Sequence, residues 1–263
     1  MTHSAHRHVV LIPSYNTGAR LEPTVRAALS AWEHVWVVID GSSDGSDRAL
    51  DGLSAGHAGF RLIHKSSNTG KGAAVQHGAE LAIEAGFSHA LVMDADGQHP
   101  GSSIRPLIEA SSSEPKSMIM GQPIFGEDVP KARLYGRRLT IFWTELETLS
   151  AGLGDTLFGM RVYPLKKLCA VLRATRFARG YDFDPEVAVR MVWRGVRPIQ
   201  VPVPVRYFSK EEGGVSHFHY LRDNVKLTLL HFRLMTLFII FGLWRTLWAK
   251  KAWNRPGRSQ TEV

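Results

Sequence analysis

Two aspartates one residue apart, Asp94 and Asp96, are the residues of this sequence best suited to chemistry. They follow the apolar run 90–93, which predicts a buried strand because it is short and flanked by polar residues. Acids at the end of such a strand lie at the carboxyl edge of a sheet, where open α/β folds bind ligands. With the side-chain carbonyl of Gln98, the two carboxylates form an oxygen set that suits Mg²⁺ or Mn²⁺ held together with substrate phosphates. Alone, the pair also fits an acidic β-turn.

The wider segment favours the metal site. Residues 94–100 read Asp-Ala-Asp-Gly-Gln-His-Pro, which resembles the Asp-Ala-Asp-x-Gln-His-Pro signature of family 2 glycosyltransferases, in particular the dolichol- and polyprenyl-phosphate sugar transferases. Weaker similarities extend the resemblance over 9–216. It implies a nucleotide-diphospho-sugar transferase (GT-A) fold and inverting hexosyl transfer from a nucleotide-diphosphate sugar. In that reaction Asp96 is catalytic, and Asp94 contacts both the cation and the donor.

Composition narrows the partners of the chain. A length of 263 residues allows one large domain or two small ones, and the single cysteine excludes an internal disulfide and fits a reducing compartment. The net charge of +8 indicates an acidic partner, either phosphate, anionic lipid or nucleic acid. No zinc-spaced Cys/His cluster or RNA-binding aromatic signature is present, so we expect no nucleic acid. No secretory signal peptide is visible, which predicts a cytoplasmic location.

The elements that position the acidic pair follow from the hydrophobic pattern. Apolar runs at 8–12, 35–39, 60–63 and 90–93 predict strands, and helical spacing at 21–32 and 72–85 predicts helices between them. Strands that alternate with helices predict a mostly parallel central sheet flanked by helices. The polar loops after the strands should therefore gather at one edge. Beyond these elements we expect a strand at 117–121, a charged, mobile segment at 126–138, a helix at 139–153 and a proline-rich edge strand at 196–205.

The loop after the first strand resembles the nucleotide-sugar entry loop of the family. It contains Pro13, Tyr15 and Asn16 as candidate donor-binding residues. Tyr15 could pack against a nucleobase or simply cap the turn. Thr17 stands where the lipid-phosphate branch often carries an acid, so this loop departs from the pattern.

Two further loops supply candidate contacts to the nucleotide. Asp40 matches the second acid of the family's Asp-Asp-Gly-Ser segment, and Ile39 replaces the first. A carboxylate there can accept hydrogen bonds from a base imide or from ribose hydroxyls. Lys71 lies in a segment that resembles the family's Asn-x-Gly-Lys-Gly turn and could meet a base carbonyl or a phosphate. By itself such a turn is typical of a plain helix entry, and it lacks the spacing of a P-loop.

Residues that would meet the acceptor come later in the chain. Arg133 and Arg137 are one helical turn apart in a region whose arginines meet the acceptor phosphate in the lipid-phosphate transferases. A solvated basic face is the alternative. The segment from Asp155 to Arg161 resembles the family's Asp-x-x-Ser-Gly-Phe-Arg, with Phe158 in place of the serine. Asp155 could face the donor sugar or the acceptor phosphate, or cap the following turn.

A candidate base and a candidate lid complete the predicted site. Asp184 lies in a segment that resembles Gly-Tyr-x-Phe-Asp/Glu-x-Glu of these transferases, although it would also suit a helix N-terminus. An alcohol acceptor would need such a base, whereas a phosphate acceptor is already an anion. Arg206 and Lys210 precede two adjacent glycines and could close over the diphosphate, or belong to an exposed loop without a catalytic part.

The most apolar stretch, 227–248, lies near the C-terminus. Its uninterrupted core, 234–244, is shorter than the roughly 20 residues that a spanning helix needs. Trp244, Trp248 and Trp253, followed by a basic tail, predict an amphipathic helix in the headgroup layer of an anionic membrane. The alternative is a helix that packs on the domain or forms a dimer. We therefore expect a catalytic domain at 1–216, a membrane-associating appendage at 217–263, and a peripheral position on the cytoplasmic face.

Three functional hypotheses remain at this stage. The first is a metal-dependent transfer of sugar to a lipid-linked acceptor, with polyprenyl phosphate as the acceptor that the resemblance implies and another lipid-like alcohol as the runner-up. The second is a membrane adaptor that keeps the fold without the chemistry, which the substitutions at Thr17, Ile39 and Phe158 keep open. The third is a basic nucleic-acid binder, which predicts strong, salt-sensitive affinity for generic DNA or RNA.

Overall fold

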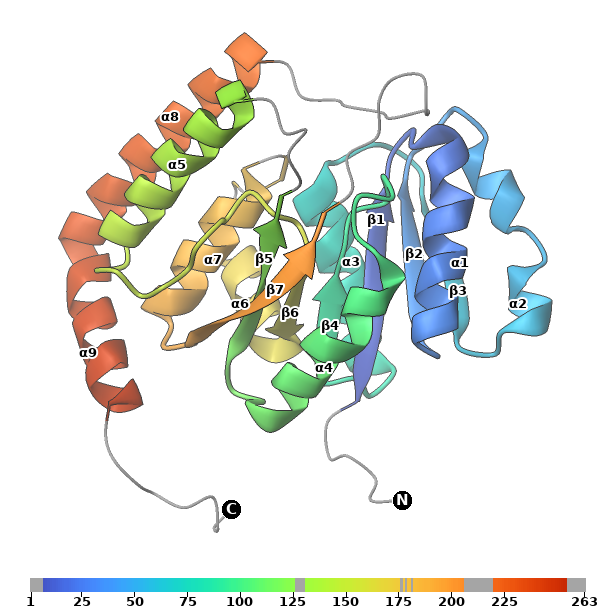
Figure 1. Ribbon diagram of the computed structural model, residues 1–263, viewed down its shortest axis with the longest axis horizontal. Coiled ribbons are helices and arrows are strands. Elements are labelled where there is room, and N and C mark those ends of the chain that lie inside the picture. The colour runs from blue at the N-terminus through green and yellow to red at the C-terminus, as the bar shows by residue number, and fades with distance from the viewer. Residues whose placement is uncertain are drawn as a thin grey trace.

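A seven-stranded sheet forms the centre of the molecule (Figure 1). The computed structural model describes residues 7–125, 131–175, 177, 179–180, 182–205 and 220–254, with the side chains of 131–135 and 220–224 left aside. The strands, in sheet order, are β3 (Phe60–Lys65), β2 (Val35–Asp40), β1 (His8–Ser14), β4 (His89–Val92), β6 (Arg161–Pro164), β5 (Met118–Ile124) and β7 (Pro198–Pro204). This confirms the predicted α/β class and the strands at the first four apolar runs.

The direction of β6 decides what reaches the carboxyl edge of the sheet. The other strands run parallel to their neighbours in the pairs β3–β2, β2–β1, β1–β4 and β5–β7, whereas β6 is antiparallel to both β4 and β5. Its first residue, Arg161, therefore pairs with Val92 at the end of β4. The loop before β6 thus lies at the same edge as the loops that follow β1, β2 and β4.

Helices cover both faces of the sheet, as Figure 1 shows. They are α1 (Leu21–Ala31), α2 (Leu53–Gly56), α3 (Lys71–Glu84), α4 (Ile104–Ser113), α5 (Lys131–Leu146), α6 (Leu165–Arg173), α7 (Phe183–Trp193), α8 (Tyr220–Leu237) and α9 (Leu243–Trp253). Helices α1 and α4 pack on one face, and α3, α6 and α7 pack on the other. Alternate residues of β1 enter the two cores, because successive side chains of a strand point to opposite faces. Continuous burial of β1, β2 and β4 explains why their sequences are unbroken apolar runs.

The boundaries of α5 correct two expectations. The predicted mobile charged segment is helical from Lys131 onward, and the helix ends at Leu146 rather than at residue 153. It ends early because Leu149 and Ser150 adopt positive φ, and the carboxylate of Glu145 then accepts the N–H groups of Gly152 and Gly154. Strand β6 and helices α4 and α6 were not predicted.

The C-terminal helix is longer than its apolar core indicated. Helices α8 and α9 join through a π-helical turn, η4 (Phe238–Gly242), and α8 runs beside α5 (Figure 1). Within the described residues, the stretch 225–253 is the one helix long and apolar enough to cross a membrane by length and composition. The expectation rested on the uninterrupted core 234–244, whereas the whole helix is long enough to span, so length no longer argues against a crossing. One side packs on the domain through Leu230, Leu234 and Phe238, while Phe232 and Trp248 are exposed.

Candidate active site

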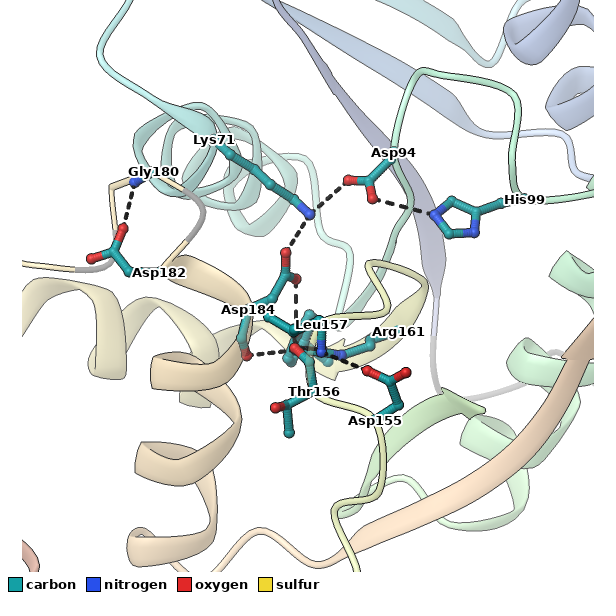
Figure 2. Close-up of polar contacts among 11 residues, drawn as sticks. Lys71, Asp94, His99, Asp155, Thr156, Leu157, Arg161, Gly180, Asp182 and Asp184 are labelled. Carbon is teal, nitrogen blue, oxygen red and sulfur yellow. Dashed lines mark hydrogen bonds and ion pairs between the residues drawn. The ribbon is translucent and has the colours of Figure 1, made fainter. Parts of the chain in front are cut away.

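Lys71 lies at the centre of the carboxyl edge, between two aspartates. Its Nζ is 2.6 Å from Asp94 Oδ1 and 2.5 Å from Asp184 Oδ2 (Figure 2). Lys71 opens α3, Asp94 follows β4, and Asp184 lies in the first turn of α7, so three distant segments converge on one ammonium group. Burial alone would lower the pKa of Lys71, but the charges of Asp184 and Asp94 raise it well above its ordinary value. Lys71 is therefore a fixed cation at this edge.

Asp94 is held by contacts on both carboxylate oxygens. Besides Lys71, it contacts His99 Nε2, which is 3.3 Å from Oδ2. Burial raises the pKa of Asp94, but Lys71 and His99 together bring it far below its ordinary value, so the carboxylate stays ionised. The buried ring of His99 in turn meets the edge of the Phe158 ring, with centroids 4.6 Å apart. The phenylalanine that replaces the expected serine thus helps to orient the histidine behind Asp94.

Asp96 is the second carboxylate of the pair and fits a cation-binding role. Its Oδ1 accepts the backbone N–H of Gln98 at 3.0 Å. Burial, and then the nearby charge of Asp94, raise its pKa. Such a raised pKa is expected where two carboxylates face one another without a bound cation. No group of three or more His, Cys, Asp or Glu in the described residues could hold a metal by itself. A Mg²⁺ or Mn²⁺ ion here would need donor oxygens from a substrate diphosphate as well.

Asp40 organises the loop that leads to Lys71. This carboxylate is almost fully buried. Its Oδ2 accepts the N–H groups of Thr69 at 3.0 Å and Gly70 at 2.7 Å, and its Oδ1 is 2.6 Å from Lys65 Nζ. The contact expected between Asp40 and a nucleotide stays a prediction. The described contacts give Asp40 a structural role, because they fix the backbone of the loop that carries Lys71.

The entry loop is joined to the loop after β2. Asn16 has a left-handed φ of 46°, donates its N–H to Ser42 Oγ at 3.1 Å, and accepts the N–H of Ser43 at 2.8 Å. Tyr15 is partly exposed beside it, and Pro13 is buried within β1. The loop is therefore a preformed wall at the edge, and the stacking of Tyr15 on a nucleobase stays a prediction.

The predicted acceptor residues are only partly covered by the structure. Arg137 Nη1 is 2.5 Å from Asp155 Oδ2. The N–H of Asp155 donates to Gln122 Oε1 at 3.0 Å, and Asp155 Oδ1 accepts the N–H of Leu157 at 3.0 Å. Asp155 thus shapes its own turn and pairs with an arginine. The side chain of Arg133, and both predicted lid residues, Arg206 and Lys210, lie outside the described residues.

Arg161 is a site residue to which the sequence assigned no role. It is fully buried and donates to the backbone oxygens of Asp184 at 2.7 Å and Thr156 at 2.5 Å (Figure 2). Its Nη1 also donates to the hydroxyl of Tyr163 at 3.2 Å. A second contact joins Arg161 Nη1 to Asp184 Oδ1 at 3.6 Å. Arg161 therefore ties the loop before β6 to the start of α7. The sequence signal for this role was the presence of an arginine in an otherwise apolar strand.

Comparison with known proteins places this site in a family. Residues 9–168 match the family described as Glycosyl transferase family 2, which is more than half of the chain. The chain belongs to glycosyltransferase family 2. This confirms the predicted family and, with it, the enzyme class.

Relatives of this glycosyltransferase carry names that agree with its sequence signature. It is 29% identical over 216 residues to polyprenol monophosphomannose synthase from Mycolicibacterium smegmatis, covering 80% of each chain. It is 27% identical over 219 residues to undecaprenyl-phosphate mannosyltransferase from Micrococcus luteus, covering 80% of this chain and 86% of that one. These matches confirm the relationship to polyprenyl- and dolichyl-phosphate sugar transferases.

A solved structure supports the fold of the glycosyltransferase. The mannosyltransferase PcManGT from Pyrobaculum calidifontis, in complex with GDP-Man and Mn²⁺, superposes with a TM-score of 0.58 at 15% identity. The match covers 97% of this chain and 78% of that one. At this identity the likeness shows the GT-A-type fold.

Proposed function

We propose that the glycosyltransferase moves a hexose from a nucleotide-diphosphate sugar to polyprenyl phosphate at the cytoplasmic surface of a membrane. The observation that carries this proposal is the Lys71-centred edge, where Asp94 and Asp184 meet one ammonium group. This edge lies between the loops of Tyr15 and Asp40, which would face the nucleotide, and the loop of Arg161, which would face the acceptor. The names of the polyprenyl-phosphate relatives support the choice of acceptor.

For donor binding, the chain supplies the entry loop, the ammonium of Lys71 and the carboxylates of Asp94 and Asp96. Tyr15 would stack on the base, and Asp40 with Asn16 would hold the loops that surround the nucleotide. Asp94, Asp96 and Gln98 would hold Mg²⁺ or Mn²⁺, which would neutralise the charge of the departing diphosphate. PcManGT, whose structure contains GDP-Man and Mn²⁺, supports a divalent cation of this kind. Arg206 and Lys210 would close over the leaving group.

The contacts of Asp184 favour a phosphate acceptor over an alcohol. Its Oδ2 receives the ammonium of Lys71 at 2.5 Å, and its Oδ1 is 3.6 Å from Arg161. Both carboxylate oxygens of Asp184 are thus turned toward cations of the protein itself. An alcohol would need a general base to attack the anomeric carbon, whereas a phosphate oxygen is already anionic at neutral pH. Asp184 would then position Lys71, and Arg137, held by Asp155, would receive the acceptor phosphate together with Arg133.

The proposed function divides the chain into a catalytic part and a membrane-binding part. Residues 1–216 would form the catalytic domain, and 217–263 would hold it at an anionic membrane. The exposed side chains of Phe232, Ile240 and Trp248 give the C-terminal helix a lipid-compatible face.

A direct assay tests the proposal. Purified enzyme is given a panel of UDP- and GDP-hexoses, with Mn²⁺ or Mg²⁺, and either polyprenyl phosphate or the corresponding polyprenol. We expect glycolipid only from the phosphate, loss of transfer on chelation, and loss in Asp96→Asn. The control Asp51→Asn, at an exposed position, should keep wild-type activity. Transfer that survives chelation would contradict the role of the cation, and transfer to polyprenol would favour the alcohol acceptor. Metal-dependent nucleotide binding that is absent altogether would support the adaptor hypothesis.

A further inference from the structure

A buried group of charged side chains joins the C-terminal helix to α7, outside the residues assigned to the reaction. Glu186 is fully buried in the first turn of α7. Its Oε2 receives Arg233 of α8, and its Oε1 receives Arg190 Nε at 2.8 Å. A buried carboxylate oxygen that loses its charged partner is destabilising, and without α8 Glu186 Oε2 would lose Arg233 while Oε1 kept Arg190.

Arg233 also holds the segment between α6 and α7. Its guanidinium lies 3.7 Å from the centroid of the Phe177 ring, in cation–π geometry. Thr175 Oγ1 donates to Glu186 Oε1 at 3.0 Å and accepts the N–H of Phe177 at 3.1 Å. One arginine of α8 thus fixes both the start of α7 and the described part of the preceding segment.

That segment contacts the loop of Lys71. The carbonyl oxygen of Arg179 accepts the N–H of Gly72 at 3.0 Å. A methyl group at Gly70 would lie 2.0 Å from the same oxygen, so the two backbones are in close contact. The guanidinium of Arg179 also donates to Gln76 Oε1, in α3, at 2.9 Å. Lys71 therefore takes its place between two glycines that both lie against Arg179.

A second route from Arg233 to Lys71 runs through α7 itself. Asp184, which binds the ammonium of Lys71 at 2.5 Å, lies two residues before Glu186 in the same helical turn. A displacement of Glu186 would therefore be passed to Asp184 through the backbone of this turn. Both routes end at the same lysine.

We propose that Arg233 is a positioning residue that keeps Asp184 and the Arg179 carbonyl against the Lys71 loop. The site is then complete only when α8 is docked on α7. The predicted effect of Arg233 on kcat rests on the proposed sugar transfer, whereas its predicted effect on the Lys71 loop does not. Because Arg233 belongs to the apolar helix 225–253, seating of that helix is physically connected to order at the carboxyl edge.

The experiment compares Arg233→Met with the matched control Arg245→Met in the full chain. Arg245 belongs to the same apolar helix, is exposed, and lies 5.2 Å from the centroid of the Phe241 ring. Amide hydrogen exchange of residues 68–74 is measured without substrate, and kcat and KM are measured with polyprenyl phosphate in detergent. We expect R233M to raise exchange at 68–74 and lower kcat, each about tenfold, with little change in acceptor KM. The control should change neither, and Arg233→Lys should recover part of kcat because it keeps the charge but not the planar group.

The outcomes separate this inference from the proposed function. If wild-type enzyme transfers no sugar but R233M still raises exchange at 68–74, the proposed function fails and the positioning contact stands. Unchanged exchange at 68–74 in folded R233M overturns the inference, and so does raised exchange with unchanged kcat in an active enzyme. If R233M does not fold, Phe177→Leu decides, because this ring is half exposed. It should raise exchange at 68–74 to a smaller extent, and no increase would overturn the inference.

Discussion

Gly159 lies directly against the carboxylate of Asp94. A methyl group at Gly159 would lie 2.2 Å from Asp94 Oδ2 and 2.7 Å from Asp94 Cγ, both far inside van der Waals contact. The loop before β6 therefore packs directly on the carboxylate that also contacts Lys71 and His99. Only a residue without a side chain fits there while Asp94 keeps both partners.

This contact predicts that Gly159→Ala damages the site more than the fold. The new methyl group should turn Asp94 away from Lys71 and His99, and a misplacement near 1 Å can cost about 100-fold in rate. Steady-state kinetics should therefore show kcat/KM lowered by roughly this factor, and calorimetric titration should show weaker Mn²⁺ binding. Gly56→Ala is the control, because a methyl group at Gly56 meets nothing within 4 Å. Wild-type kinetics in G159A would contradict the proposed place of Asp94.

Removing the central ammonium should destabilise the protein. In Lys71→Met, the carboxylates of Asp94 and Asp184 lose their shared cation, and Asp184 stays buried. Breaking a buried pair on one side costs about 3 kcal/mol, because an uncompensated charge remains. Urea unfolding should show a loss of this order, and Lys71→Met with Asp184→Asn should recover part of it. Arg26→Met breaks the exposed pair with Glu22 and should change the unfolding free energy by less than about 1 kcal/mol. Equal losses of unfolding free energy in Lys71→Met and Arg26→Met would argue against a buried, charged site.

The strands that carry the site could be read from the sequence, but their neighbours could not. β1, β2 and β4 are buried on both faces, so each is an unbroken apolar run, and the polar loops that follow them were placed correctly at one edge. β6 is only four residues long and begins with a buried arginine. Its charge is stabilised by the backbone oxygens of Thr156 and Asp184. Because Asp184 belongs to a later segment of the chain, the local hydrophobic pattern cannot reveal this contact.

The same limit of local patterns explains which contacts of the site were not predicted. Lys71 and Asp184 are 113 positions apart, and each fits a plain helix start when its own segment is considered. Only the fold shows that they share a hydrogen bond. Likewise, Arg233 belongs to a helix whose composition indicates lipid, and its pairing with Glu186 depends on how α8 packs. Sequence gives the type of each group, whereas tertiary structure decides its partner.

The raised pKa of Asp96 predicts that cation binding weakens as pH falls. Burial and the charge of Asp94 raise this pKa above its ordinary value of 3.8. The folded protein without cation therefore holds a proton on Asp96 at a higher pH than an isolated aspartate would. A cation must displace that proton, so its affinity is full above the raised pKa and falls by about tenfold per pH unit below it. Calorimetric titration with Mn²⁺ and nucleoside diphosphate at several pH values between roughly 4.5 and 7.5 measures this slope.

Two variants separate the contribution of Asp96 from the other titrating groups. Asp96→Asn should weaken Mn²⁺ binding at every pH and remove most of the slope. Asp51→Asn, at an exposed turn, should leave both unchanged. A slope that persists in D96N would assign the proton to another group and remove Asp96 from the cation site.

The pair of Arg137 and Asp155 predicts a separation between donor and acceptor effects. Arg137 Nη1 is 2.5 Å from Asp155 Oδ2, and its guanidinium also lies 5.3 Å from the centroid of the Phe125 ring. If the guanidinium receives the acceptor phosphate, Arg137→Met should raise the KM for polyprenyl phosphate about tenfold or more, since a charge-assisted contact is lost. The Kd for the nucleotide sugar should stay within about twofold of wild type, because the donor loops are carried by β1, β2 and α3.

Arg138→Met is the matched control for this prediction, since Arg138 is the next residue of α5 and is exposed. It removes the same charge from the same helix, so a general effect of net charge on a lipid-linked substrate would appear in both variants. Arg137→Lys should restore less than full acceptor affinity, because an ammonium cannot reproduce the two-pronged geometry that a guanidinium offers to phosphate. Equal KM values in R137M and R138M would move the acceptor phosphate away from Asp155, and a raised donor Kd in R137M alone would place Arg137 on the nucleotide side instead.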